Sequence, residues 1–123
     1  MHRVKWLGYT ISVVLLFTFG TGCKRNTAAH QALLPRYFAS MEDGLKHERR
    51  GDYGRAIQIY TLALSETDDV ATDLRTQSKI AVHNRMAVCY RSMGKTDKAV
   101  SEFKISLALG DTRYAPKALS KIR

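Results

Sequence analysis

The chain has 123 residues, of which 45% are hydrophobic and 25% are charged, a composition typical of a globular protein. Its length accommodates one small domain with an appendage and excludes two ordinary domains. Lys and Arg (20) outnumber Asp and Glu (11), but they are spread along the chain without a basic run or a base-reading motif. The net charge of +9 therefore predicts a basic solvated surface and not a nucleic-acid-binding protein.

Residues 1–22 have the layout of a targeting segment. Arg3 and Lys5 give a positive start, residues 6–19 are mostly apolar, and residues 20–22 are small. Cys23 follows directly. This order resembles a bacterial lipoprotein signal peptide, with Gly at position 20 where that family prefers Leu.

The resemblance implies that Cys23 is lipidated and becomes the mature N-terminus. Because Lys24 follows it instead of Asp, the resemblance implies the periplasmic face of the outer membrane, or the cell surface. The alternative is a single-pass membrane anchor, because residues 6–23 are 18 uncharged residues, the short limit for crossing a bilayer. In the lipoprotein interpretation, residues 23–34 comprise the lipidated Cys23 and a polar, flexible tether.

Residues 35–123 are predicted to form one helical domain. Apolar residues recur there at three- and four-residue steps, and Gly or Pro marks the breaks. The predicted helices cover about 35–50, 53–66, 70–92, 96–109 and 114–122. Asp68 and Asp69 are expected to cap the start of the third helix.

Residues 51–64 return in altered form as residues 94–107. Each copy begins with Gly, has Ala five residues later and an aromatic residue four further on, and ends with a small residue followed by Leu. These steps place the apolar residues on one helix face, and the Gly favours the end of a preceding helix. The corresponding pairs are Gly51 and Gly94, Ala56 and Ala99, Tyr60 and Phe103, Ala63 and Ser106, and Leu64 and Leu107.

The helix before the second copy contains Met86, Ala87 and Tyr90, and the one before the first copy contains Gly44. Together these patterns resemble the tetratricopeptide repeat (TPR), a helix-turn-helix unit. The two glycines lie 43 residues apart, against the usual ~34, and the excess is predicted to lengthen the third helix.

The TPR resemblance implies an all-α fold made of antiparallel helix pairs in a short solenoid. Its two repeats would span about 37–70 and 71–113, and residues 114–123 would form a capping helix. The residues implied to pack the repeats are Gly44, Ala56, Tyr60, Ala63, Ala87, Tyr90, Ala99, Phe103 and Ser106.

In TPR proteins the first helix of each pair lines a groove that binds a peptide or a partner helix. Carried over by position, the resemblance implies a groove formed by Phe38, Met41, Leu45, Glu48, Asn84, Val88 and Arg91. Phe38 and Met41 are equally compatible with a place in the core.

No catalytic or metal-binding pattern emerges. His47 and His83 lack the neighbours of a triad or a metal site, and packing explains them better. Cys89 lies in a predicted buried helix and is expected to be an unreactive core thiol. We therefore expect neither an enzyme nor a cofactor.

The sequence favours a membrane-tethered TPR adaptor or scaffold that mediates protein–protein interaction in a bacterial cell envelope. Two repeats are fewer than the usual three, so the exposed face of the first helix pair is expected to meet a partner protein or a second copy. The alternative function is a basic domain that binds anionic lipid or cell-wall polymer at the membrane surface.

Overall fold

The computed structural model describes residues 35–122, so the predicted signal segment, Cys23 and the tether lie outside the described residues. In the described part of the chain every element is helical, which confirms the all-α prediction. Five α-helices and one turn of 3-10 helix (η1) follow in the order α2 Arg36–Arg49, α3 Tyr53–Glu66, η1 Thr67–Asp69, α4 Thr72–Ser92, α5 Thr96–Ala108 and α6 Ala115–Lys121.

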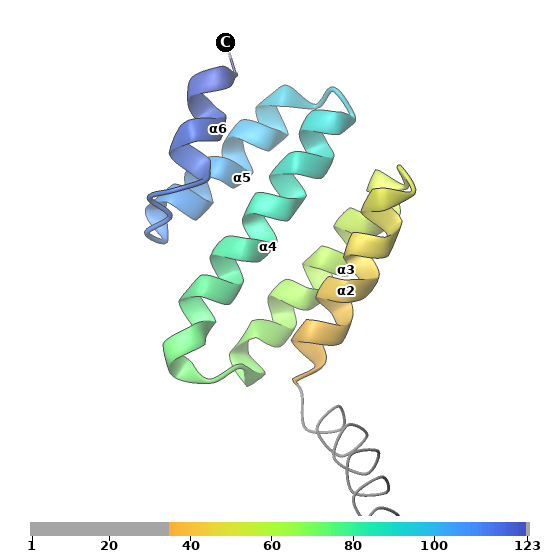
Figure 1. Cartoon of the computed structure of the whole chain (residues 1–123), viewed down its shortest axis with the longest axis vertical. Coiled ribbons are helices and arrows are strands. Elements are labelled where there is room, and N and C mark those ends of the chain that lie inside the picture. Colours follow the sequence, from red (N-terminus) through yellow and green to blue (C-terminus); the bar gives the residue numbers. More distant parts are fainter. Residues whose placement is uncertain (1–34, 123) are drawn as a thin grey trace, which may run out of the picture. The chain divides into compact units, whose positions relative to one another are not determined.

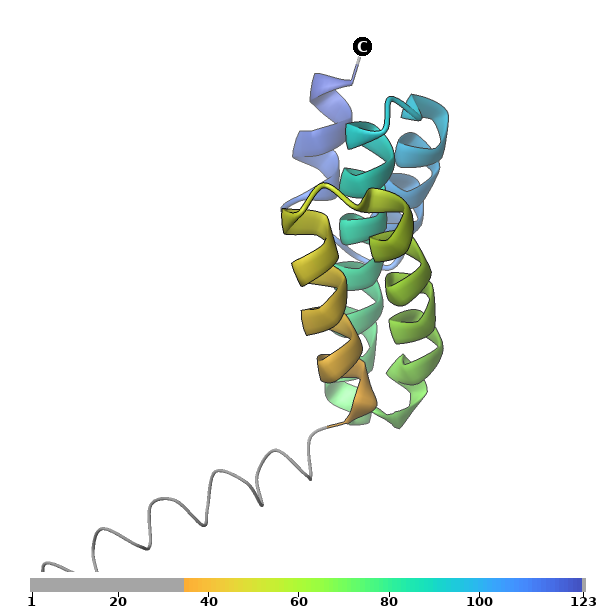
Figure 2. The same cartoon turned by 90° about the vertical axis from the view of Figure 1, so that its right-hand side faces the viewer.

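Successive helices pack against one another as antiparallel neighbours (Figure 1). After a quarter turn of the view, α2, α4 and α6 lie on one side of the domain and α3 and α5 on the other (Figure 2). Two layers of helices result, and each layer contributes one face to solvent.

Glycine ends three of the helices in the same way. Gly51, Gly94 and Gly110 have φ values of 77°, 74° and 106°, which side chains with a Cβ rarely adopt. In each turn the amide after the glycine donates to a carbonyl of the last helical turn, for example Asp52 N to His47 O at 3.0 Å. This arrangement satisfies carbonyls that the helix end leaves open and reverses the chain.

The first core lies between α2, α3 and α4. Gly44 of α2 meets the ring of Tyr60 of α3 so closely that a Cβ at position 44 would collide with the ring. Tyr60, Ala56 and Ala63 are fully buried. The same cluster includes Tyr37, Val70, Val82, Met86 and Cys89.

The second core repeats this pattern between α4, α5 and α6. Ala87 and Phe103 take the places of Gly44 and Tyr60, and each lies 43 residues further along the chain. Both are fully buried, together with Ala115 of α6. The other expected packing residues Ala99 and Ser106 are fully buried, and Tyr90 is partly buried.

The lengthened third helix is present as α4, which has 21 residues. The predicted capping by Asp68 and Asp69 is wrong, since both lie in η1 and the N-cap of α4 is Ala71, without a side-chain bond. The chain instead becomes extended at Val70, whose side chain is buried in the first core. Burial of this apolar side chain moves the acidic residues away from the helix start.

None of the helices from α2 to α6 has both the length and the hydropathy needed to cross a bilayer.

Candidate binding groove on α4 and α6

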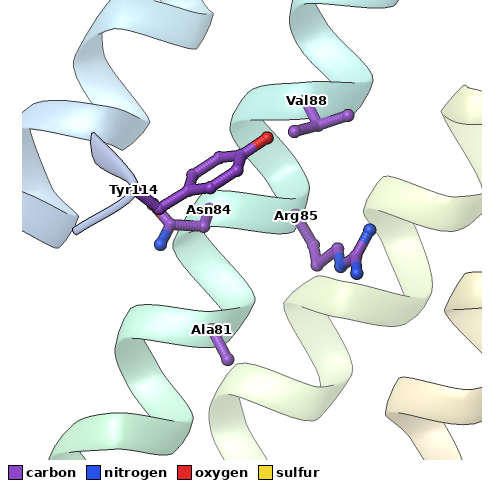
Figure 3. Close-up of a pocket in the computed structure, with 5 residues that line it drawn as sticks. All are labelled: Ala81, Asn84, Arg85, Val88 and Tyr114. Carbon is purple, nitrogen blue, oxygen red and sulfur yellow. The ribbon is translucent and has the colours of Figure 1, made fainter. Parts of the chain in front are cut away.

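A pocket of about 260 Å³ lies on the face that α4 shares with the start of α6 (Figure 3). Four of its residues come from α4 at helical steps of three and four, so they share one face of that helix. Tyr114, directly before α6, closes one side. The lining residues are Ala81, Asn84, Arg85, Val88 and Tyr114.

Asp111 holds Tyr114 in place. Its carboxylate, 7% exposed as a residue, accepts hydrogen bonds from the backbone amides of Arg113, Tyr114 and Ala115 at 2.9, 3.0 and 2.9 Å. Asn84 Nδ2 donates to the same carboxylate at 2.8 Å. One buried side chain thus fixes the start of α6 against α4.

The protonation of Asp111 follows from these bonds. Burial alone would raise its pKa, but the hydrogen bonds from Asn84 and from the three amides lower the pKa well below the ordinary value. The carboxylate is therefore charged at neutral pH and remains a strong acceptor.

The side chain of Tyr114 is partly packed against the core and partly exposed. Its centroid lies 6.0 Å from that of Phe103, which anchors its base to the second core. The residue is still 46% exposed, and its hydroxyl points toward Val88 (Figure 3). A half-exposed aromatic side chain of this kind offers contact area at small entropic cost to a partner.

Asn84 has one unsatisfied atom. Its Nδ2 is used by Asp111, but Oδ1 is buried and has no hydrogen-bond partner among the described residues. An unpaired buried acceptor is destabilising until a donor reaches it. Since the atom has almost no accessible surface, it is not open to a donor from a bound segment.

Arg85 connects the pocket to the first core. Its guanidinium lies 3.2 Å from Glu48 Oε1, and Tyr60 Oη donates to Glu48 Oε2 at 2.6 Å. The Glu48 side chain is only 14% exposed. Burial, and then the bond to Glu48 and its charge, raise the pKa of Tyr60, so the phenol stays neutral and acts as a donor.

The residues expected to form the groove do not all lie in it. Asn84 and Val88 line the pocket, and Arg91 is exposed further along α4. Phe38 is 42% exposed on α2, while Met41 packs on the first core and Leu45 is half-buried. Glu48 is used within the fold by its bonds to Tyr60 and Arg85.

Sequence reasoning missed Ala81, Arg85 and Tyr114. The first two share the helical face of Asn84 and Val88, so this spacing was the signal that could have found them. No sequence pattern marked Tyr114, because its position depends on a hydrogen bond between Asn84 and Asp111, which are far apart in the sequence.

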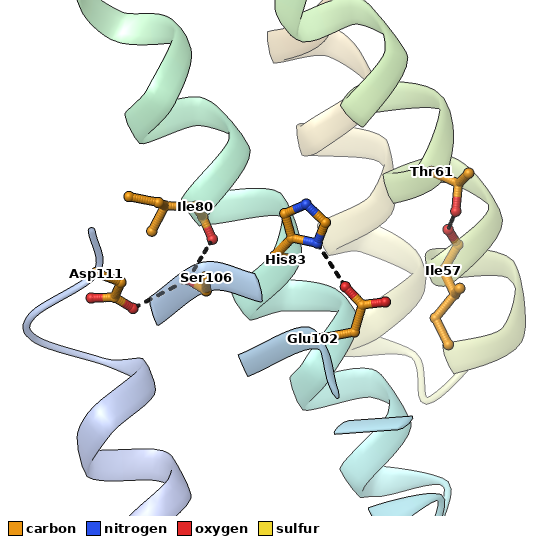
Figure 4. A network of polar contacts seen from close by, with 7 residues as sticks. All are labelled: Ile57, Thr61, Ile80, His83, Glu102, Ser106 and Asp111. Carbon is orange, nitrogen blue, oxygen red and sulfur yellow. Dashed lines mark hydrogen bonds and ion pairs between the residues drawn. The ribbon is translucent and has the colours of Figure 1, made fainter. Parts of the chain in front are cut away.

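The two histidines between residues 35 and 122 make polar contacts within the fold. His83 Nδ1 lies 2.7 Å from Glu102 Oε2 and joins α4 to α5 (Figure 4). His47 Nδ1 of α2 lies 3.1 Å from Asp52 Oδ2 in the turn between α2 and α3. Ser106, between α4 and α5, donates weakly to Ile80 O at 3.5 Å and to Asp111 at 3.4 Å, while Thr61 bonds to Ile57 O within α3. Apart from the bond within α3, these contacts connect neighbouring elements of the fold.

Cys89 is fully buried and is a free thiol in the part of the chain that the structure describes. Burial, with a smaller contribution from the charge of Glu48, raises the pKa of its thiol to about 12. Between residues 35 and 122 no three metal-ligating side chains come together in a group that could hold an ion. The pocket beside Tyr114 is a candidate binding site, because its wall is mainly apolar and contains a half-exposed aromatic ring.

Comparison with models of known protein families, with curated proteins and with solved structures found no match to this chain.

Proposed function

We propose that the chain is a non-enzymatic, membrane-tethered adaptor of the bacterial cell envelope. Its domain is a short TPR-like solenoid, with repeats at about 37–70 and 71–113 and a cap at 114–123. It holds the protein components of an envelope assembly together.

The recurrence of packing pairs supports the repeat reading. Gly44 against Tyr60 and Ala87 against Phe103 use the same combination of a small and an aromatic residue, separated by the same 43 residues. A close approach of two helices at a small residue is what the TPR pattern requires.

The pocket on α4 and α6 carries the functional proposal. It combines a half-exposed aromatic ring at Tyr114 with the apolar side chains of Val88 and Ala81. Concave sites with mainly apolar walls and few polar groups are typical of binding sites. A protein segment could place one apolar side chain beside Tyr114 and Val88.

The tether follows from the lipoprotein resemblance of residues 1–23. Acylation of Cys23 would attach the chain to the membrane, and residues 24–34 would provide the spacing. An acyl anchor places the domain near envelope partners without any contribution from its own surface.

Site-specific photo-crosslinking tests the proposal. A photoreactive phenylalanine at Val88, in the full chain in the cells that produce it, is expected to yield a discrete crosslinked protein. The same residue at Lys104, exposed on α5, is the matched control. Equal crosslinking at both positions, or none at Val88, would contradict a binding site on this face.

A second candidate is binding of anionic lipid or cell-wall polymer. Residues 75–121 contain ten Lys or Arg and three Asp or Glu, which supports an anionic ligand. This candidate predicts salt-sensitive association of the full chain with anionic wall material, unchanged by substitutions at Val88 and Tyr114.

A further inference from the structure

Positive charge is concentrated at one end of the helical domain. The α2–α3 turn, the α4–α5 turn and the last turn of α6 all lie toward this end, which is the upper end in Figures 1 and 2. Its acidic residues are the exposed Asp52 and Asp97 and the partly buried Glu48, which is paired with Arg85. The exposed cations there, which we call the basic end, are Arg49, Arg50, Arg55, Arg91, Lys95, Lys98 and Lys121.

The fold does not neutralise these charges. None of the seven cations forms an ion pair with any residue between 35 and 122. The nearby Asp52 is engaged elsewhere, since it lies 3.1 Å from His47 and accepts from the amide of Arg55 at 3.3 Å. The basic end is therefore open to an external anion.

Helix stability explains only part of this pattern. Arg49 and Arg91 lie in the last turns of α2 and α4, where a cation is favourable. Arg55, Lys95 and Lys98 lie at or in the first turns of α3 and α5, where the helix dipole disfavours a cation. Within the fold, Lys98 Nζ lies 5.6 Å from the centroid of the Tyr90 ring and Arg55 donates to Gln58 Oε1 at 3.0 Å, so these local contacts offset only part of the unfavourable placement.

The other end of the domain has mixed charge, with Arg36, Arg75 and Lys79 beside its acidic residues and Lys79 paired with Asp68 at 3.6 Å. The α3–α4 connection bears Glu66, Asp68, Asp69 and Asp73, and the chain enters α2 at Pro35 on that side (Figure 1). With 21 residues, α4 runs for about 31 Å between the two ends. The basic end thus faces away from the point where the preceding chain is attached.

We propose that the basic end docks the acidic surface of a partner protein. Met93, 39% exposed between Arg91 and Lys95, supplies an apolar contact among the cations. Arg and Met are enriched in protein interfaces, and complementary charge steers association. The choice of a protein over the anchoring membrane depends on the tether proposed above, which enters at the opposite end.

The test uses the full chain in nonionic detergent micelles and a short fluorescent poly-Glu peptide, with poly-Gln as the control probe. Anisotropy is expected to show poly-Glu binding at about 50 mM salt that is lost near 300 mM, because screening shortens the range of the attraction. The triple variant Arg55→Gln, Lys95→Gln, Lys98→Gln is expected to bind about tenfold more weakly. Its melting temperature should be equal or higher, since helix starts lose unfavourable cations.

The matched control removes the same charge elsewhere, through Arg36→Gln, Lys104→Gln and Arg113→Gln, all exposed outside the basic end. This variant is expected to retain most of the binding. An equal loss in both triple variants, or no binding of poly-Glu at low salt, would overturn the proposal.

A vesicle arm distinguishes lipid from protein. The full chain in phosphatidylcholine vesicles is expected not to crosslink added phosphatidylglycerol vesicles, as measured by turbidity. Crosslinking of those vesicles that the basic-end triple variant abolishes would assign the surface to lipid and overturn the proposal. Absence of poly-Glu binding by the unsubstituted chain, with Val88 photo-crosslinking intact, would refute only the basic end. Poly-Glu binding without Val88 photo-crosslinking would refute only the groove.

Discussion

Gly44 determines how closely α2 approaches α3. Since a Cβ there would collide with the ring of Tyr60, Gly44→Ala is expected to lower the free energy of unfolding by about 1–3 kcal/mol. Urea denaturation measures this. Gly54→Ala is the control, because position 54 is exposed in α3 and no atom lies within 4 Å of the added Cβ. It should stabilise by up to about 1 kcal/mol, and similar losses in both variants would refute the packing role of Gly44.

Cys89 is expected to be inert in the folded protein. Its thiol is buried and its pKa is raised to about 12, so almost no thiolate exists at about pH 8. Alkylation followed by mass mapping should leave Cys89 unmodified in the native chain and modify it fully in denaturant. Rapid native labelling would contradict the buried core.

Asp111 makes stability sensitive to acid. Its pKa is lowered by folding, so above about pH 5 its contribution is complete, and it declines as the unfolded chain takes up the proton near pH 4. Asp111→Asn should be less stable at neutral pH and lose less stability on acidification than the parent chain. Denaturation curves of both chains at neutral and at acidic pH measure this difference. Equal losses of unfolding free energy in the two chains would show that the carboxylate is not the cause.

At the scale of elements, α6 covers the second core. Ala115 and Ala118 pack on Ala87 and Phe103, so ending the chain after Asp111 would expose an aromatic core residue. The truncated chain is expected to lose about 2–4 kcal/mol of unfolding free energy. A truncated chain as stable as the parent in urea would show that α6 does not complete the core.

Substitution of Tyr114 tests binding without removing α6 from the second core. Its hydroxyl makes no bond among the described residues and its ring is half-exposed, so Tyr114→Ala should change stability by less than about 1 kcal/mol. The same variant should reduce crosslinking from Val88 several-fold. Unchanged crosslinking would remove Tyr114 from the binding site.

The elements were largely predictable from sequence because local rules determine them. Small and aromatic residues at helical spacing, and glycines able to adopt positive φ, set α2 to α5 close to their observed limits. The start of α4 was missed because burial of Val70, a tertiary effect, prevailed over capping by Asp68.

The candidate site was less predictable for a related reason. Asn84 and Val88 were found through the spacing of one helix, whereas Tyr114 depends on a bond across 27 residues between Asn84 and Asp111. Glu48 was expected in the groove, yet it is engaged by Tyr60 and Arg85 from two other helices. Contacts between distant helices leave no periodic signal in the sequence.

On the scale of the whole molecule, three regions of the chain are proposed to have different functions. The segment before Pro35 is proposed to attach the chain, the face of α4 and α6 to bind a protein segment, and the basic end to meet an acidic surface about 31 Å from the entry point. Such an arrangement suits an adaptor that contacts components at several distances from a membrane.

Intact mass spectrometry of the protein recovered from the membrane fraction of its host tests the tethered adaptor most directly. The account predicts a chain that begins at Cys23 and carries acyl groups. A full-length chain with an unmodified Cys23 would contradict the lipoprotein reading and leave residues 6–23 as a single-pass anchor.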